Sequence, residues 1–180
     1  ELVVGLDSPD DCAVVRGGDG PDAELTVHTV DFFRYFMGAC TDPYVFGRVA
    51  AVHALSDCHA MGAAPRTCLA IATLPLGLEP KVEEALYQMM AGACALLREE
   101  GCALAGGHTC EGKEASLGFA VTGVLPPNVL LRKGGMRVGD ALLLTTPLGT
   151  GTILAAEMRN RARGPWVSGA LASMSASNGA

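Results

Sequence analysis

Carboxylates at three separated points of the sequence are the side chains best suited to chemistry. Asp10 and Asp11 are adjacent in a polar loop, Asp31 follows an alternating β-type segment, and Asp57 lies in an apolar segment. A carboxylate removed from water without a partner is strongly destabilising, and several together repel one another unless a cation neutralises them. If the fold brings these points together, their oxygen atoms suit Mg²⁺ or Mn²⁺ bound to nucleotide phosphates.

A structural interpretation of the same residues stays open at this point. Asp57 can lie at the rim of a helix or pair with a base, and the other carboxylates can act as caps or solvated loop residues. Gly106 and Gly107 let backbone amides approach a phosphate closely, but they also suit a plain turn. The sequence contains neither a P-loop nor a dinucleotide fingerprint. His108, in this glycine-rich loop, is a functional candidate, whereas His53 and His59 are interpreted as ordinary helix residues.

A helix over residues 42–62 must position Asp57. Asp42 can cap its first amides, Pro43 suits the first helical position, and Gly62 suits the position just past the end. This segment is apolar nearly all the way round, which predicts a buried helix. A second helix is predicted from Pro80 to Gly101.

Short β-type segments alternate with these helices. Residues 12–16 and 25–30 predict two antiparallel strands, the second of which delivers Asp31 at its carboxyl end. Residues 66–74 and 102–105 predict strands buried on both faces, with Gly106 and Gly107 following the latter. Further strands are expected at 116–125 and 141–146, and further helices from about 152 to before 164 and over 167–178. The pattern predicts an α/β or α+β fold with a mixed sheet.

Composition limits the classes of partner. The 180-residue chain has a net charge of −6, which argues against nucleic acid or an anionic membrane surface. No apolar run is long enough to cross a membrane, and no signal peptide is visible. The chain begins at Glu1 without a Met and is expected to be a fragment.

The seven cysteines form no C-x-x-C pair, and several lie in apolar runs. We therefore expect a reduced, cytosolic protein. Zinc sites built from Cys102, His108 and Cys110, or from His53 and Cys58, do not follow the usual ligand spacing and are disfavoured.

Six motifs in order along the chain resemble the selenophosphate synthetase (selenide, water dikinase) family of the aminoimidazole ribonucleotide synthetase superfamily. They are residues 10–14 (DDCAV), 29–33 (TVDFF), 42–48 (DPYVFGR), 55–62 (LSDCHAMG), 106–109 (GGHT) and 146–151 (TPLGTG). Each motif alone is modest, but six in register are specific, and together they cover nearly the whole chain.

The resemblance implies ATP-dependent synthesis of selenophosphate from selenide and water, with AMP and phosphate as the other products. It implies Asp11 and Asp57 as magnesium ligands. The positions that it places at ATP are Ser8, Pro9, Asp10, Asp31, Asp57, Gly107, His108 and Thr109. It also implies an N-terminal ATP-binding domain over 1–127, a linker and the opening of a C-terminal domain over 128–180, and a homodimer formed through the N-terminal sheet.

Two departures from the family pattern bear on activity. The family's reactive Cys or selenocysteine, followed closely by a Lys, lies in a segment expected upstream of Glu1, so no cysteine of this chain is assigned as the nucleophile. Cys12 is interpreted as a packing residue. The family's later metal-binding Asp is expected beyond Ala180. The chain by itself is therefore expected to be inactive.

Three alternatives remain. Thiamine-monophosphate kinase, of the same superfamily, shares the acidic start and the helix motif, but it typically has Asp where this chain has His108. A hydrogenase-maturation relative of the same fold is more distant. A non-catalytic dimerisation module that keeps the fold without binding nucleotide belongs to a different class.

Overall fold

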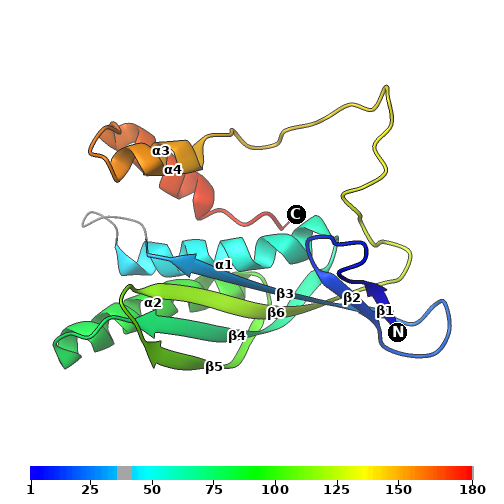
Figure 1. Ribbon diagram of the computed structural model, residues 1–180, viewed down its shortest axis with the longest axis horizontal. Coiled ribbons are helices and arrows are strands. Elements are labelled where there is room, and N and C mark those ends of the chain that lie inside the picture. The colour runs from blue at the N-terminus through cyan, green and yellow to red at the C-terminus, as the bar shows by residue number, and fades with distance from the viewer. Residues whose placement is uncertain (36–41, 180) are drawn as a thin grey trace.

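The chain forms a mixed α/β fold in a computed structural model that describes residues 1–35 and 42–179 (Figure 1). The strands are β1 (Leu2–Val4), β2 (Ala13–Arg16), β3 (Leu25–Arg34), β4 (Ala64–Leu74), β5 (Ala103–Glu111) and β6 (Ser116–Leu125). The helices are α1 (Pro43–Ala60), α2 (Glu79–Glu99), α3 (Thr150–Glu157) and α4 (Gly164–Met174).

All six strands belong to one sheet in the order β1-β2-β3-β6-β4-β5. β2 and β3 are antiparallel, as predicted, and β3 pairs with β6 along its whole length. β4 pairs antiparallel with β6 and parallel with β5. The connection from β4 to β5 runs through α2, which is the usual way to join parallel strands. The expectation of a mixed sheet is confirmed.

Helix α1 has the ends that its sequence predicts. The Asp42 side chain accepts a hydrogen bond from the Tyr44 amide at 2.8 Å, and Pro43 occupies the first turn. Gly62 follows the helix with φ +75°, a conformation that side chains disfavour. A Cβ atom on Gly47 would overlap the carbonyl group of Met89, so this glycine lets α1 and α2 pack closely.

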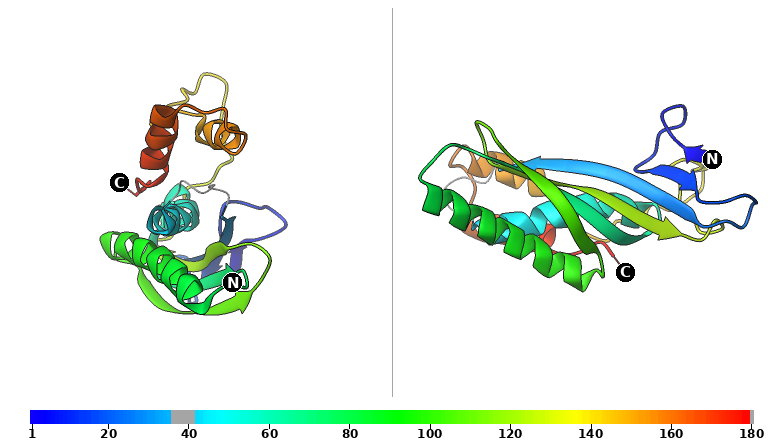
Figure 2. Two further views of the ribbon diagram at one scale, coloured as in Figure 1. Left: turned by 90° about the vertical axis from the view of Figure 1, so that its left-hand side faces the viewer. Right: turned by 90° about the horizontal axis from the view of Figure 1, so that it is seen from below.

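The two long helices cover one face of the sheet, and α3 and α4 lie on the far side of α1 (Figure 2). The core between helices and sheet includes Phe46, Leu55, Met89, Leu117 and Phe119, all almost fully buried. No helix among the described residues is long and apolar enough to span a bilayer. Because α1 contacts the sheet, α2 and α4, its nearly all-round apolar sequence is explained.

The opposite face of the sheet is open, which corrects two predictions. β4 is not buried on both faces, because Leu69 on the open face is 49% exposed while Cys68 and Ala70 point toward the helices. β5 is an exposed edge strand rather than a buried one. It continues through Gly106 and Gly107, which therefore lie inside a strand and not in a loop after it.

Two further boundaries differ from the predictions. β3 extends to Arg34, so Asp31 lies within the strand rather than at its end. Residues 141–146 form no strand; they are irregular and exposed. An isolated β-type segment needs a partner for its backbone groups, and the described residues place none beside it. Helices α3 and α4 confirm the two predicted C-terminal helices with shifted ends.

Candidate acidic nucleotide site

Asp57 is held at the junction of α1 and β3. It lies in the last turns of the helix, and its Oδ2 atom accepts a hydrogen bond from the Thr29 hydroxyl at 2.6 Å. Thr29 and Asp31 are two residues apart on β3, so both side chains project from the same face of the sheet toward α1. The packing of strand and helix thus places the Asp31 and Asp57 carboxylates near one another.

The local electrostatics couple three carboxylates. Burial raises the pKa of Asp57; the Thr29 hydrogen bond lowers it, and the negative charges of Asp31 and Asp11 raise it again. His53 Nε2 lies 3.5 Å from Asp31 Oδ2 and partly offsets this repulsion. Asp11, Asp31 and Asp57, from a loop, a strand and a helix, therefore form one acidic cluster.

The loop that precedes β2 contacts a basic pair that follows β6 in the chain. Arg132 Nε lies 2.9 Å from Asp10 Oδ2, and Lys133 Nζ lies 3.2 Å from Asp11 Oδ1. Arg132 also donates a hydrogen bond to the Ser8 hydroxyl at 3.0 Å. The Asp10 side chain is only 2% exposed. Burial would raise the pKa of Asp10, but hydrogen bonds from the Asp11 amide, Arg132 and the Lys133 amide outweigh it and lower the pKa.

The thiols beneath the cluster are packing groups. Cys12 and Cys58 are both buried, and each follows a carboxylate of the cluster in sequence. A hydrogen bond to Cys58, burial and the nearby negative charges all raise the pKa of Cys12. A protonated, buried thiol is a poor nucleophile, which agrees with the interpretation of Cys12 as a packing residue.

The donor set fits a divalent cation that is shared with phosphates. Within residues 1–35 and 42–179, no three His, Cys, Asp or Glu side chains are placed to hold a metal ion by themselves. Mg²⁺ typically takes one or two carboxylates, keeps waters and completes its shell with substrate phosphates. Asp11 and Asp57 repel one another across the cluster, and an ion between them would relieve that repulsion.

The predicted glycine-histidine segment lies elsewhere in the chain. Gly107 aligns with Asp31 along the sheet, through Ala70 and Phe119, but three strand spacings separate them, about 14 Å. His108 aligns with Ile71 and therefore points to the open face, away from α1. Within one chain, the predicted site residues therefore fall into two groups. The group near β2 and β3 is Ser8, Pro9, Asp10, Asp11, Asp31 and Asp57, and the group at the β5 edge is Gly107, His108 and Thr109.

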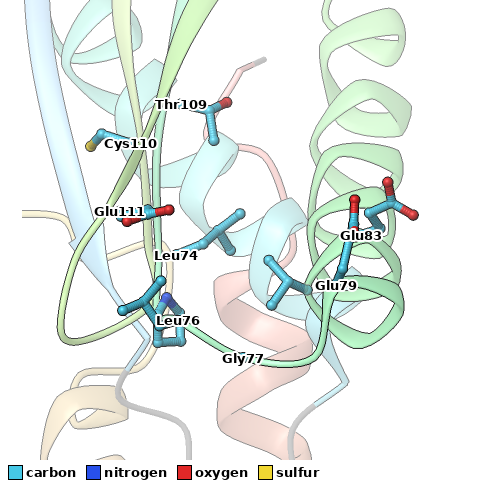
Figure 3. A pocket seen from close by; sticks show the side chains of 10 residues that line it. Leu74, Leu76, Gly77, Glu79, Glu83, Thr109, Cys110 and Glu111 are labelled. Carbon is cyan, nitrogen blue, oxygen red and sulfur yellow. The ribbon is translucent and has the colours of Figure 1, made fainter.

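Thr109 lines a different cavity, of about 330 Å³, between the ends of β4 and β5 and the start of α2 (Figure 3). Figure 3 shows Thr109 and Glu111 on the strand side and Glu79 and Glu83 on α2. Carboxylates without a lysine or arginine in this lining disfavour phosphate groups. This cavity therefore does not complete the acidic cluster as a nucleotide site.

Sequence reasoning missed four residues of the site. Thr29 precedes Asp31 by two positions on a strand, and His53 precedes Asp57 by four on a helix, so both spacings signalled a shared face. Arg132 and Lys133 lie in the segment for which only a linker and the opening of a second domain were expected. Their contacts span more than 120 positions of sequence, and no local pattern indicates them.

A comparison with protein families decides the affiliation. The family described as "AIR synthase related protein, N-terminal domain" matches residues 9–125. The chain belongs to this family. This AIR synthase related domain includes the sheet from β2 to β6, both long helices and all the carboxylates of the acidic cluster.

Curated relatives of this AIR synthase related chain are named "Selenide, water dikinase". One from Nitratidesulfovibrio vulgaris (strain DSM 19637 / Miyazaki F) is 42% identical over 159 residues, 88% of this chain and 43% of the relative. One from Desulfitobacterium hafniense (strain Y51) is 40% identical over 174 residues, 97% of this chain and 48% of the relative. The chain thus spans less than half the length of these relatives.

Solved structures share the fold of this AIR synthase related chain. Protein tt0281 from Thermus thermophilus has a TM-score of 0.74 at 18% identity, covering 97% of this chain and 54% of that one. "AaThiL complexed with AMPPCP and TMP" has a TM-score of 0.69 at 21% identity, covering 95% and 53%. Thiamine-monophosphate kinase from Stenotrophomonas maltophilia K279a has a TM-score of 0.66 at 25% identity, covering 82% and 48%.

Proposed function

We propose that this chain is the ATP-binding part of a selenide, water dikinase, which makes selenophosphate from selenide, ATP and water. Relatives of that name are about 40% identical over most of the chain. The observation that carries the proposal is the acidic cluster of Asp11, Asp31 and Asp57. We assign residues 1–127 to an ATP-binding domain and 128–180 to a linker and the opening part of a second domain.

The roles follow from the contacts of each residue. Asp11 and Asp57 would hold Mg²⁺ or Mn²⁺, which neutralises phosphate charge when bound. Thr29 fixes the orientation of the Asp57 carboxylate through its 2.6 Å hydrogen bond. Ser8, Pro9 and Asp10 form the loop wall beside the metal ligands, and Asp31 faces the nucleotide. Catalysis of phosphoryl transfer consists largely of such positioning and charge neutralisation.

We further propose that two copies pair through the open face of the sheet. Val30 is 63% and Phe32 48% exposed there, and Leu69 extends the apolar surface onto β4. A two-fold axis that runs parallel to the strands between β6 and β4 would bring the partner's β5 opposite this copy's β3. In such a dimer the β5 edge, with Gly107, His108 and Thr109, would border the partner's nucleotide site, and His108 would lie on the face shared by the two copies.

The cell compartment that we propose is the cytoplasm. All the cysteines in the described part of the chain are free thiols, including the contacting pair Cys12 and Cys58. Unpaired buried thiols are typical of a reducing environment.

The alternative is a thiamine-monophosphate kinase-like phosphotransferase. The fold of the Stenotrophomonas enzyme and of AaThiL favours it as a second candidate. The same cluster would serve that reaction, because both need metal-bound ATP. The two candidates differ in the acceptor, and the titration below separates them.

The test is calorimetric titration of the chain with ATP and Mg²⁺. Asp57→Ala removes a proposed metal ligand, and we expect roughly 100-fold weaker binding of Mg-ATP. Asp22→Ala, in the exposed turn between β2 and β3, is the matched control and retains wild-type affinity. Equal affinity of Asp57→Ala and wild type contradicts the metal site and favours a non-catalytic dimerisation module. Saturable binding of thiamine monophosphate in the presence of a non-hydrolysable ATP analogue supports the alternative kinase.

A further inference from the structure

A cavity of about 320 Å³ separates α1 from the C-terminal helices. One wall is the exposed side of α1 at His53 and Ser56, and the other is the turn at residues 146–150 with the end of α4. This turn belongs to the TPLGTG motif, to which the proposed function assigns no role. The volume lies within the range of small-molecule sites.

The cavity walls are fixed by hydrogen bonds between segments far apart in the sequence. Asn178 Nδ2 donates to the Ser56 hydroxyl at 2.8 Å, and that hydroxyl donates to the Val52 carbonyl at 2.7 Å. Arg48 Nε donates to the Ser175 carbonyl at 3.0 Å. These bonds attach the end of α4 and the following residues to α1, so the cavity is part of the packed structure.

The described lining of the cavity offers hydrogen-bond donors and contains no charged carboxylate, ammonium or guanidinium side chain. Its polar members are His53, Ser56, Thr146, Thr150, Ser173 and Asn178. Among the described residues that line it, none is Asp, Glu, Lys or Arg. Hydroxyl and imidazole groups can donate hydrogen bonds to a small anion. No carboxylate of the described residues lines the cavity itself, whereas an anion placed within the acidic cluster would meet three of them.

His53 connects the cavity to the acidic cluster. Its Nε2 atom lies 3.5 Å from Asp31 Oδ2, and its ring packs on Phe33 with centroids 4.7 Å apart. The same imidazole also lines the cavity. A small anion that contacts His53 from the cavity is therefore adjacent to the place where metal-bound phosphates would lie.

We propose that this cavity binds the phosphoryl acceptor, a small inorganic anion, and that His53 and Thr150 contact it. The inference rests on the proposed function, under which the acceptor is the hydrogen selenide anion. The selenium–phosphorus bond forms as the bridging phosphorus–oxygen bond of the nucleotide breaks. The electron pair of that bond leaves on the nucleotide oxygen, and the selenide proton passes to solvent.

The experiment is an anaerobic titration of the chain, saturated with Mg-AMPPCP, with hydrogen selenide. The readout is the imidazole Cε1–H resonance of each of the four histidines. We expect saturable shifts at His53 and unchanged resonances at His28 and His108 on the open sheet face. His53→Gln assigns its resonance. Thr150→Val keeps the side-chain shape, and we expect it to weaken binding about tenfold, since it removes a hydrogen bond to an anion.

A matched control separates loss of a contact in the cavity from a general effect of a substitution in α1. His59→Gln makes the same substitution six residues along α1, outside this cavity, and should leave selenide affinity at the wild-type value. Three outcomes overturn the inference: no shift at His53, equal shifts at all histidines, or a shift with inorganic phosphate but not with hydrogen selenide. Loss of Mg-ATP binding in the calorimetric test would instead overturn the proposed function, so the two failures are distinguishable.

Discussion

The two halves of the predicted ATP site lie in two regions of the sheet, one at β3 and one at the β5 edge. The two regions differ in how they are built. On the β3 side, a loop, a strand and a helix bring Asp11, Asp31 and Asp57 together, and Thr29 fixes the Asp57 carboxylate. At the β5 edge, Gly107 and the residues after it lie in an exposed strand without a nearby acidic group of the cluster. One chain thus assembles the proposed metal-binding half of the site. The β5 half would need a second copy of the chain to contact a nucleotide.

The largest effect is expected when the proposed dimer is disrupted, because the β5 edge of one copy can then no longer approach the acidic cluster of the other. Phe32→Glu places a charge on the apolar open face, and we expect dimerisation at least about 100-fold weaker. Sedimentation velocity measures the change. Leu76→Glu, at an exposed apolar position in the β4–α2 loop, is the control and should keep the wild-type association state.

The Phe32→Glu variant also serves to test the role of the β5 edge. His108→Ala should weaken Mg-ATP binding about tenfold in the dimer, because it removes a hydrogen bond from the partner's side of the site. In the Phe32→Glu monomer the same substitution should change affinity by less than about twofold. An equal effect in monomer and dimer, measured by calorimetry, would show that His108 acts within its own chain.

A smaller effect sharpens the description of the acidic side. The pKa of Asp57 is raised in the folded chain, chiefly by burial, so the native carboxyl keeps its proton to a higher pH than the unfolded one. Stability is therefore lost as the pH rises from the unfolded value of 3.8 through the raised pKa. Asp57→Asn should raise the melting temperature at pH 7 by about 1–2 °C without metal.

The controls for this prediction are pH and metal. At about pH 3 both forms are neutral at position 57, so the difference should vanish. Added Mg²⁺ should stabilise the wild type more than Asp57→Asn, because the variant lacks the negative ligand. Melting curves by circular dichroism that show a lower melting temperature for the variant at pH 7 would contradict the repulsion among these carboxylates.

The sequence predicted the parts that depend on local patterns. The ends of α1 follow from Asp42, Pro43 and Gly62, and the pairing of β2 with β3 follows from their alternation and the short turn between them. From the residues alone, the meeting of the carboxylates was one of two open interpretations, and the family resemblance favoured it. In the structure, Asp57 does sense the charges of Asp11 and Asp31. Their metal and nucleotide roles stay predictions.

The sequence did not predict features that depend on distant contacts. An apolar run such as 66–74 fits a strand that is buried on both faces as well as one that has an open apolar face. Which of the two forms depends on whether helices cover one face of the sheet or both. Gly106 was expected to end a strand, but a register shift opposite Cys68 and Leu69 lets β5 continue through it. The contacts of Arg132 and Lys133 with the acidic loop close over more than 120 positions and leave no local signature.

The central claim is that Asp11 and Asp57 hold one divalent ion together with a nucleotide, and that Asp31 lies beside that nucleotide. Manganese titration of the isotope-labelled chain in the presence of AMPPCP tests it directly, since a bound Mn²⁺ ion broadens the resonances of nearby nuclei. We predict that all three aspartates broaden together at substoichiometric Mn²⁺, while Asp22 and Asp140 remain sharp. Broadening of only one of the three, or of none before the exposed carboxylates, would contradict the account.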